Sequence, residues 1–207
     1  MYKDHPIFLE SISFIRAKLG PHKFSNLEVK VLERLIHASG DFQIKDLIVF
    51  SENACEIGLK ACRSGAPILT DTEMASAAVR NMAKNTNGNF VSSIKQWIDS
   101  NQKYDSTASA YGIEKAWIDL SRNYFADKSP IVLIGSAPTA LEKLLDILKG
   151  DKNKPSLVIG MPVGFIGVEH SKERLMKTNL NYIIIRSTRG GASMAAAAVN
   201  ALLRASI

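Results

Sequence analysis

Short apolar runs alternate with longer segments of helical periodicity along most of this chain. Five runs are predicted to be strands: Leu47–Phe50, Pro67–Thr70, Ile131–Ile134, Leu157–Ile159 and Tyr182–Ile185. Continuous apolar runs between helices are typical of parallel strands that are buried on both faces. Residues 90–98 show no clear pattern, so the segment 90–104 is interpreted as a sheet edge, a lid or a subunit contact.

Apolar residues at helical spacing fill the segments between these runs. They predict helices over residues 6–18, 26–40, 53–63, 72–82, 107–124, 139–149, 171–178 and 192–205. Asn26 is the expected N-cap of the second helix, because its side chain can accept a hydrogen bond from the first turn. No linker divides residues 1–207, so we expect a single α/β domain with a largely parallel sheet flanked by helices.

The last three predicted strands each end in a loop of small residues. The loops are GSAPT at 135–139, GMPVGFIG at 160–167 and RSTRGG at 186–191. In open α/β sheets ligands bind at the C-terminal edge of the strands, where such loops meet, and we expect the ligand site there. The glycine spacing matches neither G-x-G-x-x-G nor a P-loop. The spacing alone fits a ligand site and tight strand-to-helix turns equally well.

The third loop carries the most specific chemistry. Arg186 and Arg189 flank hydroxyl groups, and Gly190, Gly191 and Ser193 lead into a predicted helix. Unpaired N–H groups at a helix N-terminus attract anions, and arginine binds carboxylates with two hydrogen bonds. The alternative is a capped helix with solvated arginines. The alanine-rich stretch that follows, at 194–199, suits either core packing or a subunit contact.

One of the four histidines has a distinctive position. His37 lies at the end of an apolar helix, and imidazole exchanges protons near neutral pH, with an unperturbed pKa of ~6.5. Its local sequence favours an ordinary helix-end histidine over a catalytic acid. His5, His22 and His170 are expected at the surface, and Asp71 is expected to cap the helix that follows it.

Composition limits the classes of partner. The net charge of +6, from 26 basic and 20 acidic residues, suits a polyanionic ligand. No dense basic run indicates nucleic acid, and no apolar run approaches the ~20 residues that span a bilayer. The N-terminal residues lack the apolar stretch of a signal peptide, which favours the cytoplasm. Cys55 and Cys62 are expected to be buried thiols, and no cluster of residues suggests a metal site.

Several segments together resemble the precorrin-8X methylmutases of cobalamin biosynthesis nearly from end to end. The segments are SISFIR at 11–16, RLIHA at 34–38, GAPILTD at 65–71 and the three loops above, continued as GSAPTAL, GMPVGFIGVEHSKE and RGGASMAAAAVNALL. The resemblance implies a single α/β domain with a parallel sheet, usually dimeric. It implies an isomerase that moves a methyl group from C-11 to C-12 of a corrinoid precursor and needs no cofactor or metal.

The resemblance also assigns roles to individual residues. It places the catalytic histidine at His37, which would protonate a ring nitrogen or donate a hydrogen bond to it, and so favour a 1,5-sigmatropic shift. Ser11 and Arg34 match positions that contact the substrate, whose rim carries acetate and propionate groups. We extend substrate binding, as a hypothesis of our own, to Arg186, Arg189, Gly190, Gly191 and Ser193.

The sequence departs from the family pattern in places. Ala108 stands where relatives often carry an arginine, so Lys115 or Arg80 is a candidate to replace that carboxylate contact. The sequence leaves open whether the natural substrate, precorrin-8x or cobalt-precorrin-8, contains cobalt. The alternative function is that of a non-catalytic carrier of a tetrapyrrole, in which His37 would only hold the ligand.

Overall fold

The apolar runs form a single sheet. The computed structural model describes residues 5–99, 101, 103–123 and 128–207. Its strands are β1 (Ile48–Phe50), β2 (Ile68–Thr70), β3 (Val91–Ser93), β4 (Ile131–Ile134), β5 (Leu157–Gly160) and β6 (Tyr182–Ile185). Within these residues they pair in the order β1-β6-β5-β4-β2-β3. Only the edge strand β1 runs antiparallel to its neighbour, so the prediction of a largely parallel sheet is confirmed.

The predicted helices lie close to their expected places, and the described residues also contain two short helices that were not predicted. They are α1 (Pro6–Leu19), α2 (Asn26–Ser39), α3 (Ile44–Leu47), α4 (Ala54–Arg63), α5 (Glu73–Asn85), the 3-10 helix η1 (Ile94–Trp97), α6 (Ala108–Asn123), α7 (Pro138–Gly150), α8 (Val168–Met176) and α9 (Ala192–Ala205). The helix predicted over 107–124 is α6, and Tyr124 lies outside the described residues. Leu47 was predicted in a strand but ends α3, because the Ile48 N–H donates to the Ile44 carbonyl and closes a helical turn over Ile44–Leu47.

The cap of α2 was assigned to the wrong residue. Ser25, not Asn26, is the N-cap, because its hydroxyl accepts from the Glu28 N–H while the Glu28 carboxylate accepts from the Ser25 N–H. This reciprocal pair satisfies two backbone donors, whereas an Asn26 cap would satisfy one. At the other end of α2, Gly40 adopts a left-handed conformation and its N–H bonds to Ile36, which ends the helix just after His37.

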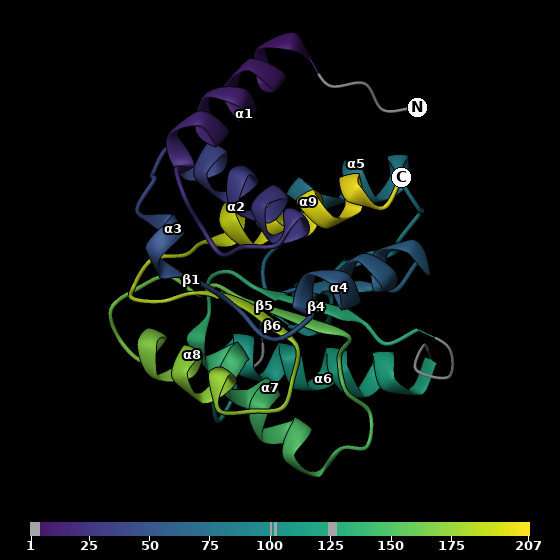
Figure 1. Ribbon diagram of the computed structural model, residues 1–207. Coiled ribbons are helices and arrows are strands. Elements are labelled where there is room, and N and C mark those ends of the chain that lie inside the picture. The colour runs from purple at the N-terminus through teal and green to yellow at the C-terminus, as the bar shows by residue number, and fades with distance from the viewer. Residues whose placement is uncertain (1–4, 100, 102, 124–127) are drawn as a thin grey trace.

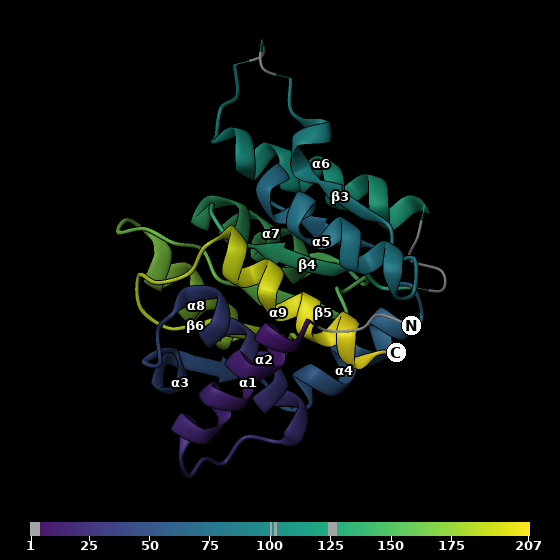
Figure 2. The ribbon, with the colours of Figure 1, turned by 90° about the horizontal axis from the view of Figure 1, so that it is seen from above.

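Helices cover both faces of the sheet. In Figure 1, α2, α4, α5 and α9 lie on one face and α6, α7 and α8 lie on the other. Helix α1 lies outside α2 and forms an extra outer layer. Seen from above, α9 crosses the middle of its layer, between α2 and α4 on one side and α5 on the other (Figure 2).

The alanine stretch of α9 is core, which decides between the two alternatives. Residues Ala195, Ala196 and Ala198 are at most 1% exposed, and α9 packs on α2, α4 and α5. Small side chains allow these helices and the sheet to approach closely. The segment 90–98 forms the edge strand β3 followed by η1, so for these residues the sheet-edge interpretation is confirmed.

Candidate functional site

The three small-residue loops meet at the C-terminal edge of the parallel strands. The Gly191 N–H donates to the Met161 carbonyl at 2.8 Å, which joins the loop after β6 to the loop after β5. The Gly164 N–H donates to the Thr188 carbonyl at 3.1 Å and makes a second link. Gly135, after β4, packs so tightly that an added Cβ would lie 2.6 Å from the Cα of Ala192. These loops are therefore one connected surface.

Close packing requires the glycine at position 190. A Cβ on Gly190 would lie 2.1 Å from the Met161 carbonyl oxygen and 2.8 Å from that of Pro162. Both atoms belong to the backbone and cannot rotate away. The sequence left open whether the glycines make room for a ligand or allow tight turns. At Gly190 the reason is tight contact between the two loops.

Asp71 holds the loop after β4, and its predicted role as a helix cap is wrong. It is 1% exposed and accepts hydrogen bonds from the N–H groups of Gly135, Ser136 and Ala137, at 3.0, 2.6 and 2.9 Å. Thr72 caps α5 instead, because its hydroxyl lies 3.1 Å from the Ala75 N–H. Burial raises the pKa of Asp71, and the three N–H donors oppose that rise.

Arg189 joins the loop after β6 to the end of α2. Its guanidinium donates to the Asp41 carboxylate and, at 2.7 Å, to the Gln43 side-chain oxygen. Asp41 lies four residues after His37, so this contact brings the loop next to the helix end that carries the histidine. Arg186 and Ser193 are both exposed.

His37 occupies the last turn of α2 and faces α1. Its Nδ1 lies 2.9 Å from the Ser11 hydroxyl, and its ring meets the edge of Phe8 with centroids 5.3 Å apart. Burial lowers the pKa of His37 from its ordinary 6.5, and the positive charge of Arg34 lowers the pKa further. The imidazole is thus held in one orientation and releases its proton more readily than a free histidine.

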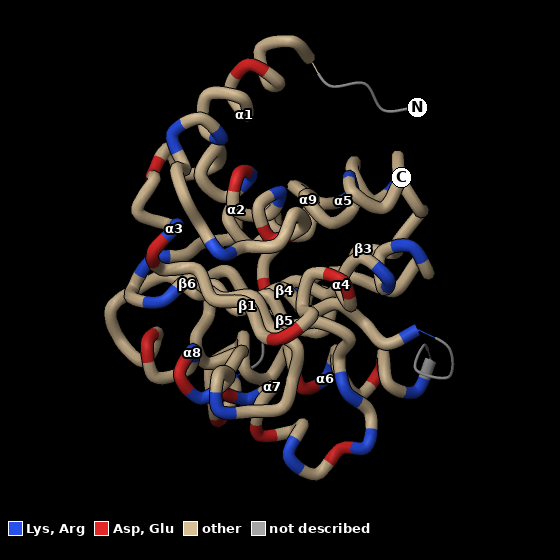
Figure 3. The backbone as a smooth tube through the Cα atoms, viewed as in Figure 1, with Lys and Arg blue, Asp and Glu red and all other residues tan. Residues whose placement is uncertain are grey.

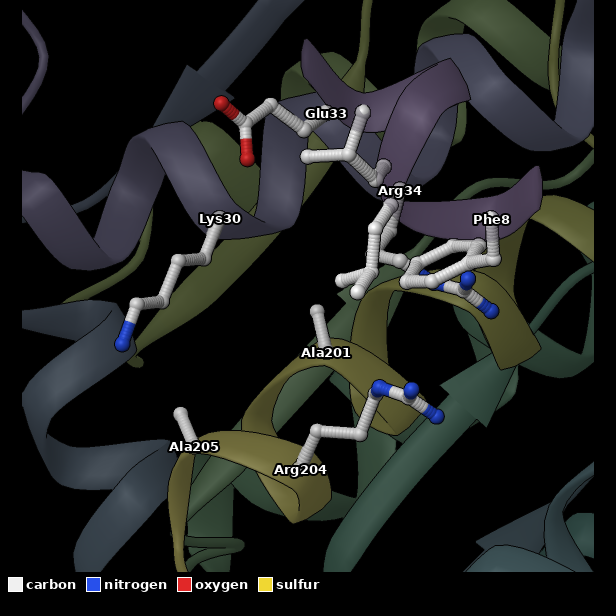
Figure 4. A pocket seen from close by; sticks show the side chains of 9 residues that line it. Phe8, Lys30, Glu33, Arg34, Ala201, Arg204 and Ala205 are labelled. Atoms are coloured by element: carbon white, nitrogen blue, oxygen red, sulfur yellow. The ribbon is translucent and has the colours of Figure 1, made fainter. Parts of the chain in front are cut away.

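A cavity of about 210 Å³ lies between α1, α2 and α9 (Figure 4), and Phe8, whose ring contacts His37, is one of the residues that line it. Its lining residues are Phe8, Leu9, Ile12, Lys30, Glu33, Arg34, Ala201, Arg204 and Ala205. The guanidinium groups of Arg34 and Arg204 lie over the Phe8 ring, 4.7 and 5.0 Å from its centroid. Figure 4 shows both of these side chains reaching toward Phe8, whereas Lys30 points away from it.

The charge of this cavity is positive. Its acid, Glu33, is already bound by Arg16 through two hydrogen bonds of 2.6 and 2.9 Å. Lys30, Arg34 and Arg204 give the lining of the cavity three cationic side chains against the single carboxylate of Glu33. Elsewhere, Lys and Arg positions alternate with Asp and Glu positions over both helical layers (Figure 3). The cavity can accept a carboxylate group, and the histidine next to it can exchange a proton.

The structure thus arranges the predicted site residues in two groups. Ser11, Arg34 and His37 lie together between α1 and α2, and the 186–193 residues lie in the loop after β6. Sequence reasoning missed Phe8, although it lies three residues before Ser11 and shares its helix face. It also missed Lys172. This lysine lies four residues after Val168, on the buried face of α8, where an apolar side chain would be expected.

The remaining candidates have ordinary surroundings. His5, His22 and His170 are exposed, as predicted, and the His5 side chain caps α1. Arg80 pairs with Glu73 at 2.9 Å, and Lys115 lies 5.3 Å from the centre of the Tyr111 ring. Cys55 and Cys62 are buried free thiols, as predicted, and burial raises both pKa values, that of Cys62 to about 12.

The described residues contain neither a cluster of metal-ligating side chains nor a membrane-spanning helix. Among those residues no group of three or more His, Cys, Asp or Glu side chains is placed to hold a metal ion. No helix in the same part of the chain has the length and apolarity to cross a membrane.

Comparisons with known proteins agree with one another. The sequence model of the precorrin-8X methylmutase family matches residues 6–205. The chain is 32% identical over 193 residues to the cobalt-precorrin-8 methylmutase of Priestia megaterium, covering 93% of this chain and 84% of the relative. It is 31% identical over 200 residues to the precorrin-8X methylmutase of a Sinorhizobium species, covering 96% and 93%. The structure is similar to that of the precorrin-8x methyl mutase from Thermus thermophilus, with a TM-score of 0.84, 33% identity and coverage of 97% and 95%.

Proposed function

Because this chain belongs to the precorrin-8X methylmutase family and is therefore an isomerase of cobalamin biosynthesis, we propose the reaction that it catalyses. The chain moves a methyl group from C-11 to C-12 of precorrin-8x or cobalt-precorrin-8 by a 1,5-sigmatropic shift. The products are hydrogenobyrinic acid and cobyrinic acid, respectively. The match of the family model over residues 6–205 is the observation that carries the proposal.

In this proposal His37 is the proton donor. As imidazolium, His37 donates its Nδ1–H to the Ser11 hydroxyl oxygen, and its Nε2–H, on the far side of the ring, protonates a ring nitrogen of the substrate. When the ring is neutral and Ser11 donates to Nδ1, the Nε2–H only donates a hydrogen bond to that nitrogen. A lowered pKa makes imidazolium a stronger acid, so the proton transfer becomes easier. A shift within one molecule needs such a donor and a site that holds the ring in one conformation.

The substrate carboxylates are bound by the two groups of site residues. Arg34 and Arg204 receive one carboxylate arm in the cavity beside Phe8, while Ser11 and His37 face the ring. Arg186, Ser193 and the first turn of α9 bind further arms at the C-terminal edge of the sheet. Helix geometry leaves the N–H groups of such a first turn without acceptors inside the helix.

The other three loop residues shape this site. The Gly191 N–H is already donated to Met161, so Gly190 and Gly191 act through the tight turn that they allow. Arg189 acts through its contact with Asp41, which brings the α9 loop close to His37.

We also propose that the chain forms a homodimer and works in the cytoplasm. Phe165 and Ile166, at the tip of the loop after β5, are 89% and 87% exposed, and Phe14 of α1 is 55% exposed. Large exposed apolar side chains that lie together, as the sequence neighbours Phe165 and Ile166 do, mark contact surfaces. The buried free thiols suit a reducing compartment. Light scattering after size-exclusion chromatography tests the dimer.

The test of function is the visible absorption spectrum of precorrin-8x and of its cobalt form, with and without the protein. Moving the methyl group changes the conjugation of the ring, so turnover shifts the spectrum toward that of the product. His37→Ala should abolish the shift, whereas the matched control His170→Ala, at an exposed histidine, should retain it. Binding without conversion would favour a carrier, and the form that is converted identifies the substrate.

A further inference from the structure

A lysine side chain is buried beneath the loop that joins β6 to α9. Lys172 lies on α8 and is 1% exposed. Lysine is almost never fully buried unless its ammonium group has partners. We propose that Lys172 is a positioning residue, whose ammonium group holds residues 187–191 in the conformation that substrate binding requires. This inference rests on the proposed function of that loop.

The contacts of the ammonium group define the path of the loop. Lys172 Nζ donates to the Ser187 carbonyl at 2.8 Å and to the Arg189 carbonyl at 2.6 Å. Two carbonyls that are two residues apart can reach one ammonium only if the chain curls around it. The guanidinium of Arg189 then extends from this curl toward Asp41.

One hydrogen bond lies within the curl, from the Arg189 N–H to the Ser187 hydroxyl at 3.3 Å. Ser187 has φ +70°, in the left-handed region that side chains other than glycine rarely adopt. Such a conformation persists when surrounding contacts impose it. From outside the curl, the Gly164 N–H donates to the Thr188 carbonyl, the Gly191 N–H donates to Met161, and the Lys172 ammonium donates to the two carbonyls on either side of Thr188.

The charges around Lys172 come from α8 and from the loop itself. Glu169 and Glu173 of α8, with Arg186 and Ser187 of the loop, line a cavity of about 290 Å³ next to it. Within the described residues, its hydrogen bonds go to the two carbonyls rather than to a carboxylate. Burial lowers the pKa of Lys172 to about 8, and Glu169 opposes this shift, so the group is mainly protonated at neutral pH.

The experiment compares Lys172→Met with the matched control Lys177→Met, an exposed lysine at the end of the same helix. Methionine keeps an unbranched apolar stem and removes the charge and the donors. Hydrogen–deuterium exchange is measured for the peptide that covers 187–191, and KM and kcat are measured with the form of precorrin-8x that the wild type converts.

The expected result for Lys172→Met has two parts. Exchange rises in 187–191 but not in the strands of the sheet. KM rises about tenfold while kcat changes by less than about threefold, because substrate binding is weakened and the proton donor is intact. Lys177→Met should match the wild type in both measurements.

Other results would overturn the inference. Exchange that rises evenly over the whole protein, or an unchanged KM, would mean that Lys172 only stabilises the fold. If Lys172→Met does not fold, Lys172→Arg keeps the charge on a larger head group and must show the same local exchange and KM change. If exchange in 187–191 is faster in Lys172→Met but the wild type converts neither form of the substrate, the role of Lys172 in holding the curl is supported. The proposed function is then refuted instead.

Discussion

Gly190→Ala offers the sharpest test of how the loops at the sheet edge are built. The added Cβ would lie 2.1 Å from the Met161 carbonyl oxygen, a distance that real Cβ contacts do not show. Gly191→Ala is the matched control, since its nearest neighbour would be the Ser193 hydroxyl at 4.0 Å. Both glycines have backbone conformations that favour glycine, with φ +159° and +131°, so the steric overlap is the main difference between them.

The magnitudes follow from these two terms. A side chain in a region that is essentially glycine-only costs about 1–3 kcal/mol, and both variants carry this cost. Forcing a methyl group against packed atoms costs about 1–3 kcal/mol more, and only Gly190→Ala carries it. We therefore expect Gly190→Ala to lower the free energy of unfolding by about 2 kcal/mol more than Gly191→Ala does. In a chain of this length that is about 4–8 °C in melting temperature.

Urea unfolding followed by circular dichroism measures the difference, provided that both variants keep the same slope against urea. If the two variants lose the same free energy of unfolding within about 0.5 kcal/mol, the loops do not meet as closely as described. A difference of that size is no larger than the usual scatter in mutational free energies. Because the overlap displaces the loop that carries Arg189, Gly190→Ala should also raise KM more than Gly191→Ala does.

Three further predictions concern the proposed reaction. Because burial and Arg34 lower the pKa of His37 below 6.5, proton transfer predicts that kcat falls as pH rises above that lowered pKa; a flat pH profile would instead indicate hydrogen-bond donation by the neutral ring. Arg189→Ala should raise KM several-fold with an unchanged circular dichroism spectrum, and unchanged affinity would refute its role. Asp41→Ala should do the same and the double variant no more, because the two side chains form one contact. Arg204→Ala should weaken substrate binding with little effect on kcat, as steady-state kinetics would show, and an unaltered KM would remove the cavity from the site.

Strands and helices were predicted well where burial has a local pattern. The runs Ile131–Ile134 and Tyr182–Ile185 are strands with the predicted bounds, and Ala192–Ala205 is a helix with the predicted bounds. In contrast, β3 reads Val91-Ser92-Ser93, and no apolar pattern indicates a strand. Its serines are 0% exposed because neighbouring elements cover them, which is a tertiary effect.

The residues of the candidate site were likewise predicted in part. Resemblance in sequence pointed to His37, Ser11 and Arg34, and these side chains are neighbours in space. Local sequence alone favoured an ordinary role for the histidine, since helical spacing does not reveal that Ser11, 26 residues earlier, lies 2.9 Å from its ring.

The α/β class, most of the helices and strands, and the loops that meet at the sheet edge could be predicted from the order of the residues. These features follow from the periodic burial of apolar side chains, which produces a pattern among residues that are close in the sequence. The partners of several charged side chains, in contrast, were set by how the elements pack together. The buried Asp71 binds the loop after β4 and the buried Lys172 binds the loop after β6, while the partly exposed Arg189 reaches Asp41 across 148 positions of the chain. A buried charge must find its partner wherever the fold brings one, so its role depends on the assembled layers rather than on its neighbours in sequence.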